Sequence, residues 1–154
     1  MKAIRTRHPK RERGVVAKRI TLARILEVAF WGTVIWGVLR IVAHYFHFTP
    51  YGIGAFARPF LGTYGENSLP GIALGTMVLF IAALAATFVY ALVFGKVRFW
   101  WIGILYGLGI MLAAGYFFRM GHWDRDTFST EAAWYLSFGL FIGMTLVLER
   151  FDEV

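Results

Sequence analysis

Cysteine is absent from the 154-residue chain, and only nine residues are acidic. Without thiols, disulfides, thiolate metal sites, thiol nucleophiles and lipidated cysteines are all excluded. The short motifs of hydrolases and nucleotide-binding proteins are missing as well: there is no H-E-x-x-H, G-x-S-x-G, S-x-x-K or G-x-x-x-x-G-K-[ST]. No general acid and base pair is recognisable. We therefore expect no enzyme, and the sequence names no catalytic residue and no cofactor.

Apolar residues, in contrast, are abundant: 58% of the chain is hydrophobic, against about 45–50% in soluble domains. Four apolar stretches, at about 21–47, 69–95, 99–118 and 132–148, follow a basic segment at 1–19. A membrane-spanning helix needs about 20 apolar residues, so the last stretch is at the lower limit of length. The sequence predicts an all-α protein in which residues 20–154 form a four-transmembrane-helix bundle, multi-pass in the cytoplasmic membrane.

The first stretch is the least uniform, because Arg24, Glu27 and Arg40 interrupt it. Arg24 and Glu27 are three residues apart, so we expect them to pair near the inner end and to reach toward the headgroups. A cleaved signal peptide is the alternative, but the small-x-small cleavage site that it requires is missing. We interpret this stretch as a membrane span.

The net charge of +7 is concentrated in the tail, where half of the 16 basic residues precede position 20. Basic residues beside a membrane span bind anionic lipid headgroups, at about 1 kcal/mol each. We expect this of a disordered tail through Arg5, Arg7, Lys10, Arg11, Arg13, Lys18 and Arg19. Nucleic acid is not expected as a partner, because no folded basic face or stacking platform accompanies the charge. The positive-inside rule places the tail, Lys96 and Arg98 on the cytoplasmic side, and with them both termini.

Glycines recur at one-turn spacing in three of the predicted spans. In lipid, helices associate closely where small residues are four apart. The candidate packing residues are Gly71, Gly75, Gly103, Gly107, Gly139 and Gly143. They predict packing of the helices within the chain; self-association, a larger membrane complex and a substrate groove are the alternatives.

Two motifs in the predicted third and fourth spans carry a family resemblance. They are W-x-G-I-x-Y-G from Trp101 to Gly107 and Y-x3-G-x-F-I-G-x5-E from Tyr135 to Glu149. Together with Phe46–Thr49 and Arg58–Gly62 in the first outer loop, they resemble the YqhR family of conserved membrane proteins from spore-forming Gram-positive bacteria. The resemblance implies a four-helix membrane fold and supplies no activity.

The polar residues that stand out lie near the outer end of the first span. Arg40, His44 and His47 share one helical stripe, which His122 and Asp124 of the last outer loop could meet. Imidazoles and a carboxylate can ligate a divalent metal. Alternatively, the histidines are interfacial, and Arg40 snorkels or pairs with an acidic loop residue. We assign no metal site, and we place Glu131 among the solvated residues of that loop.

Glu27 is the only acidic residue within a predicted span, which makes it a candidate proton-coupled binding residue. These observations leave three functions open. The first is a non-enzymatic accessory or scaffold subunit that packs through its glycine-rich helix faces. The second is a small transporter or channel that uses Glu27 and Arg40. The third is a membrane metal-binding protein or enzyme at the outer face.

Overall fold

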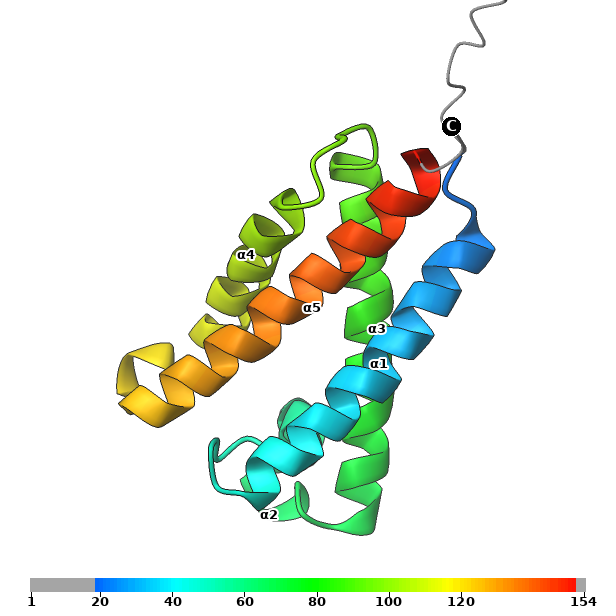
Figure 1. Cartoon of the computed structure of the whole chain (residues 1–154). Coiled ribbons are helices and arrows are strands. Elements are labelled where there is room, and N and C mark those ends of the chain that lie inside the picture. Colours follow the sequence, from blue (N-terminus) through cyan, green and yellow to red (C-terminus); the bar gives the residue numbers. More distant parts are fainter. Residues whose placement is uncertain (1–18, 152–154) are drawn as a thin grey trace, which may run out of the picture.

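The computed structural model describes residues 19–151, and this part of the chain is all-helical (Figure 1), as the sequence predicts. It contains no strand. The elements are α1 (Leu22–Tyr45), η1 (Ile53–Ala57), α2 (Arg58–Gly65), α3 (Leu69–Val93), α4 (Ile102–Phe117), η2 (Met120–His122) and α5 (Arg125–Phe151).

The four longer helices form two pairs, α1 with α3 and α4 with α5 (Figure 1). Additional contacts between α1 and α5 join the pairs. α3 and α4 meet through side chains: the Tyr106 hydroxyl of α4 donates to the Ala86 carbonyl oxygen of α3 (2.6 Å), and the Tyr90 and Tyr106 rings lie 5.2 Å apart. The start of α1 and the end of α5 lie together at one end of the molecule, which we call the terminal end. The opposite end carries α2 and η2, and we call it the loop end.

Three helices, α1, α3 and α5, are long and apolar enough to cross a membrane. α4 has only 16 residues, or about 24 Å at 1.5 Å per residue. The last two helices therefore differ at their ends from the predicted spans at 99–118 and 132–148. The chain from Phe99 to Trp101 forms turns instead of the first turn of α4, and α5 begins at Arg125 rather than at Ala132.

Side-chain caps explain where three of these helices begin. The Thr21 hydroxyl accepts from the Arg24 amide (3.3 Å) before α1, and the Ser68 hydroxyl accepts from the Gly71 amide (3.1 Å) before α3. Before α5, the Asp124 carboxylate accepts from the Thr127 amide (2.8 Å). Each cap satisfies an amide that has no partner in the first turn. Because Asp124 caps α5, the helix begins almost two turns before the predicted last span.

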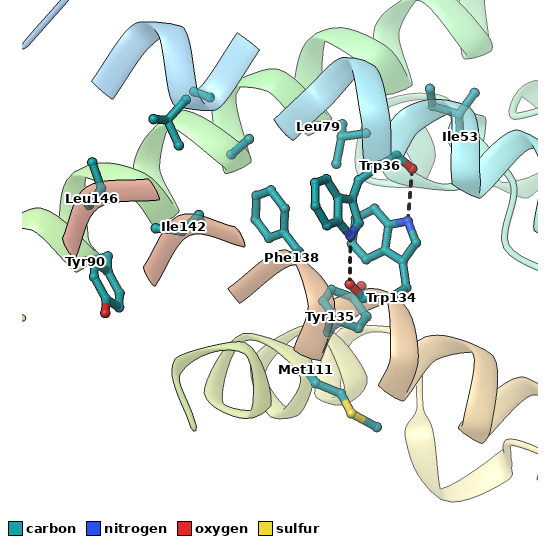
Figure 2. Close-up of a cluster of buried hydrophobic side chains, with 13 residues drawn as sticks. Trp36, Ile53, Leu79, Tyr90, Met111, Trp134, Tyr135, Phe138, Ile142 and Leu146 are labelled. Atoms are coloured by element: carbon teal, nitrogen blue, oxygen red, sulfur yellow. Dashed lines mark hydrogen bonds between the residues drawn. The ribbon is translucent and has the colours of Figure 1, made fainter. Parts of the chain in front are cut away.

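Two tryptophans lock α1 onto α5 in the core (Figure 2). Trp36 Nε1 donates to the carbonyl oxygen of Trp134 (3.1 Å), and Trp134 Nε1 donates to the carbonyl oxygen of Trp36 (2.9 Å). Phe138, one turn after Trp134 on α5, makes an edge-on contact with the Trp36 ring and stacks on the Trp134 ring. Both indole N–H groups are thus satisfied inside an apolar cluster, where leaving them unpaired would be costly.

The six predicted packing glycines are all in contact with other parts of the same chain. A Cβ atom added at any of them would approach a neighbouring backbone atom to less than 3.0 Å. Gly103 and Gly107 of α4 interleave with Gly139 and Gly143 of α5. Gly71 and Gly75 of α3 instead admit the backbone of Ile53–Gly54 and Gly65–Glu66, which precedes that helix. None of the six is open to a second chain.

Candidate functional site

The main polar feature of the molecule is an ion pair enclosed in its core near the loop end. Arg40 of α1 and Glu131 of α5 are 1% and 0% exposed, and Arg40 Nη1 donates to Glu131 Oε1. The Thr49 hydroxyl donates to the same carboxylate oxygen at 2.7 Å. Buried charges persist in proteins only when they are paired and hydrogen-bonded. We call Arg40, Thr49, Glu131 and the adjacent Tyr135 the buried polar centre.

Aromatic rings surround the arginine of this centre. The Arg40 guanidinium carbon lies 4.2 Å from the centroid of the Trp134 ring, 5.5 Å from that of Phe56 and 5.8 Å from that of Tyr135. Aromatic faces within about 6 Å attract a cation. The rings thus replace part of the hydration that the buried Arg40 loses.

Several polar atoms of the centre have no hydrogen-bond partner within the described part of the chain: Arg40 Nε, Arg40 Nη2, Glu131 Oε2 and the Tyr135 hydroxyl. A buried polar atom without a partner costs about 1–3 kcal/mol. The two arginine nitrogens are donors, the carboxylate oxygen is an acceptor, and the tyrosine hydroxyl can donate or accept. The centre therefore has the capacity to bind one further small polar species, or to hold a proton.

Sequence reasoning identified one half of this centre and missed the other. Pairing of Arg40 with an acidic residue was one of the two interpretations of its position, whereas the assignment of Glu131 to a solvated loop was wrong. The error follows from the misplaced start of α5. Glu131, Tyr135, Phe138, Ile142 and Leu146 are all buried, at spacings of three and four. This helical spacing of the buried face extends back to Glu131, so it could have indicated that Glu131 lies on the buried face of the helix.

Glu27 lies far from the buried polar centre. Arg24 Nη1 donates to Glu27 Oε2 at 2.8 Å, as the spacing predicted, and Arg24 also contacts Glu149 of α5. The Glu27 side chain is 54% exposed at the terminal end, and Arg40 follows it by about 20 Å along α1. Glu27 and Arg40 therefore do not form one site.

The predicted outer cluster of histidines and Asp124 does not come together. His44 is partly buried, and its Nδ1 lies 3.2 Å from the Thr49 carbonyl oxygen. His47 and His122 are exposed, and Asp124 caps α5. Within residues 19–151, no three His, Cys, Asp or Glu side chains gather as metal ligands would. Hydrogen bonds from Thr127 lower the pKa of Asp124, so the cap loses its charge only in more acidic solution than an ordinary carboxyl group would.

Of the predicted headgroup-binding residues, only Arg19 is described, and it is exposed. Arg5, Arg7, Lys10, Arg11, Arg13 and Lys18 lie outside the described residues.

Comparison with known proteins places the chain among membrane proteins. The family model described as "Conserved membrane protein YqhR" matches residues 6–153. A Bacillus subtilis (strain 168) protein named "Uncharacterized protein YqhR" is 28% identical over 135 residues, which cover 82% of this chain and 75% of that protein. No solved structure matches the chain. The chain belongs to the YqhR family of conserved membrane proteins.

Proposed function

We propose that the protein is a non-enzymatic accessory subunit of the cytoplasmic membrane, in which α1, α3, α4 and α5 all cross and both termini are cytoplasmic. Three of these helices have the length and composition of spans. α4 is shorter, but Trp100, Trp101 and Tyr116 flank it, and such aromatic residues belong at headgroup level. The basic residues before α1 and between α3 and α4 support the orientation.

This topology predicts a pattern of chemical labelling, which the absence of cysteine makes simple to read. Thr63→Cys and Gly121→Cys at the loop end should react with a membrane-impermeant maleimide on intact cells, because both positions are exposed. Val97→Cys, between α3 and α4, should react only after permeabilisation. Labelling of position 97 alone on intact cells would reverse the proposed orientation.

The single observation that carries the accessory role is an apolar groove of about 560 Å³ that runs along α4 beside the end of α3. The residues that line it are Phe94, Trp101, Ile102, Leu105, Tyr106, Gly109, Ile110 and Ala113. Nearly all of this surface is apolar, so it suits a transmembrane helix rather than a polar substrate.

The groove also holds the small residues that close helix packing requires. Gly109 and Ala113 are four apart and exposed, and a Cβ atom added at Gly109 would meet nothing within 4 Å. The six glycines discussed above, in contrast, are closed by the chain's own backbone. Helix association in lipid depends on such small residues at this spacing. We infer that a transmembrane helix of another protein docks on Gly109 and Ala113.

Photo-crosslinking in native membranes tests this docking. A photoreactive amino acid at Leu105, which lines the groove, should give a discrete adduct heavier than the chain. Leu108, on the same helix and also exposed, lies outside the groove and provides the matched control position. Gly109→Leu should reduce the adduct at position 105 about tenfold or more, because the side chain fills the space that the partner needs.

The mass of the adduct separates the possible outcomes. An adduct of fixed mass that differs from twice the chain's own supports a partner subunit, and the twofold mass would show self-association instead. Equal yields at positions 105 and 108, or an adduct that Gly109→Leu leaves unchanged, would overturn the proposal.

The buried polar centre favours a second candidate, a proton-coupled transporter. Glu131 Oε2 and the Tyr135 hydroxyl have no partner among the described residues, and intramembrane carboxylates commonly carry protons. In this candidate function the residues that act with Arg40 include Glu131, instead of the Glu27 expected from the sequence. Solute or proton flux in proteoliposomes that Glu131→Gln abolishes, and Glu27→Gln leaves intact, would favour it over the accessory role.

A further inference from the structure

A second pocket, of about 580 Å³, opens at the loop end between α2 and η2. Its polar lining comes from Arg58 and Thr63 of α2 and from Arg119 and His122 around η2. The rings of Tyr51 and Phe118 stand 4.8 Å apart at its wall. The pocket therefore combines cationic and hydroxyl donors with an aromatic wall, at the level where α4 ends.

The charge of this pocket is positive. Arg58 is held in place by Glu66, to which its Nε and Nη2 both donate, and its guanidinium lies over the Tyr51 ring. The hydrogen bond with Glu66 raises the pKa of Arg58, which keeps it cationic. Arg119 forms no ion pair with any other residue in 19–151. One acidic side chain thus faces two arginines and a histidine.

Arg119 adopts a backbone conformation that arginine rarely uses. Its φ is 55° and its ψ is 57°, in the left-handed region, directly after α4. For a residue other than glycine this conformation is sterically unfavourable, because Cβ lies close to the backbone. Such strained positions cluster at ligand-binding sites. Here the residue in this conformation lines the pocket, and its side chain forms no ion pair within residues 19–151.

A backbone carbonyl at the end of α4, beside the pocket, is already hydrogen-bonded. The last carbonyls of a helix carry partial negative charge. At the end of α4, the Phe118 carbonyl oxygen accepts hydrogen bonds from the Tyr51 hydroxyl (2.9 Å) and from Trp123 Nε1 (3.2 Å). These two donors satisfy the carbonyl oxygen, and Arg119 is the arginine of the pocket that forms no ion pair within residues 19–151.

We propose that this pocket binds a phosphate group, presented as the headgroup of an anionic phospholipid. Phosphate oxygens accept hydrogen bonds from guanidinium, imidazole and hydroxyl donors, and Arg119, His122 and Thr63 supply these three kinds. Phe117 and Phe118 give the glycerol and the first acyl carbons an apolar wall. The site lies at the loop end, opposite the start of α1, and it does not depend on the groove along α4.

Native mass spectrometry of the full chain in detergent tests this site, with phosphatidylglycerol as the probe. Diacylglycerol, which lacks the phosphate, serves as the matched lipid. We expect phosphatidylglycerol to be retained in preference to diacylglycerol. Arg119→Gln should weaken its binding about tenfold, because hydrogen bonds to a charged group are lost. Arg125→Gln removes a nearby exposed arginine that does not line the pocket and should have little effect.

Titration with inorganic phosphate distinguishes the lipid from a free anion. Displacement of phosphatidylglycerol only by a large excess of phosphate supports the headgroup. Binding of inorganic phosphate that depends on Arg119, without any preference for phosphatidylglycerol, would overturn the lipid assignment in favour of a soluble phosphate ligand. Equal retention by the wild type and Arg119→Gln, or equal binding of diacylglycerol, would overturn the site altogether.

Discussion

Replacement of Glu131 by leucine should lower the free energy of unfolding by about 3–5 kcal/mol, the cost of leaving one partner of a buried ion pair without the other. Arg40 is 1% exposed and forms no second ion pair within residues 19–151. Its stacking on Trp134 at 4.2 Å persists in the variant, but a desolvated cation–π contact contributes only about 2 kcal/mol. Unfolding in mixed micelles, followed by tryptophan fluorescence, measures the loss.

The double variant Arg40→Met/Glu131→Leu provides the decisive comparison. Removal of both charges leaves no uncompensated ion, so the double variant should be clearly more stable than Glu131→Leu alone, and comparable to the wild type. Asp126→Leu, at an exposed acidic residue of the same helix, should cost less than about 1 kcal/mol. A double variant as unstable as Glu131→Leu would show that the ion pair is not the cause.

The same variants separate a structural role of the buried polar centre from a transport role. If the ion pair only joins α1 to α5, the double variant should keep the fold, and with it the crosslink to a partner at position 105. A proton-coupled role requires the carboxylate of Glu131 itself. Loss of function in a stable double variant would therefore favour transport over the accessory role.

The sequence was sufficient for the helical class and for most helix positions, because uncharged apolar runs are a strong signal in lipid. The ends of the helices were harder to predict. α5 begins at Arg125 since Asp124 caps it, and the polar residues of its first two turns concealed the helix from a hydropathy criterion. That one boundary determined whether Glu131 was assigned to solvent or to the core.

The pairing of the helices could not be predicted, because small residues at a spacing of four have the same appearance on every helix. One interface joins Gly103 and Gly107 of α4 to Gly139 and Gly143 of α5. Gly71 and Gly75 of α3 instead face the segment between α1 and α3. A Cβ atom added at Gly109 of α4 would meet nothing within 4 Å. Only the three-dimensional arrangement separates the helix glycines used inside the chain from Gly109, which is left open.

Gly139→Leu should separate α4 from α5. A Cβ atom at position 139 would collide with the backbone of Gly103 and Gly107. Backbone cannot rotate away as a flexible side chain can, so the cost exceeds the usual 1–3 kcal/mol or so of overpacking. α4 meets α5 backbone to backbone at these glycines, whereas it meets α3 through the Tyr106 side chain, whose hydroxyl donates to the Ala86 carbonyl oxygen (2.6 Å). The close approach of α4 to α5 therefore depends on the glycine interface.

Distance measurements between spin labels test this dependence, because the chain has no cysteine of its own. Labels on Leu108→Cys of α4 and Met144→Cys of α5, both exposed, should give a single narrow distance in the wild-type background. Gly139→Leu should lengthen and broaden that distance. Gly109→Leu adds the same side chain to α4 where nothing lies within 4 Å, so it should leave the distance unchanged. An unchanged narrow distance in Gly139→Leu would mean that α4 is held by something other than its glycine contact with α5.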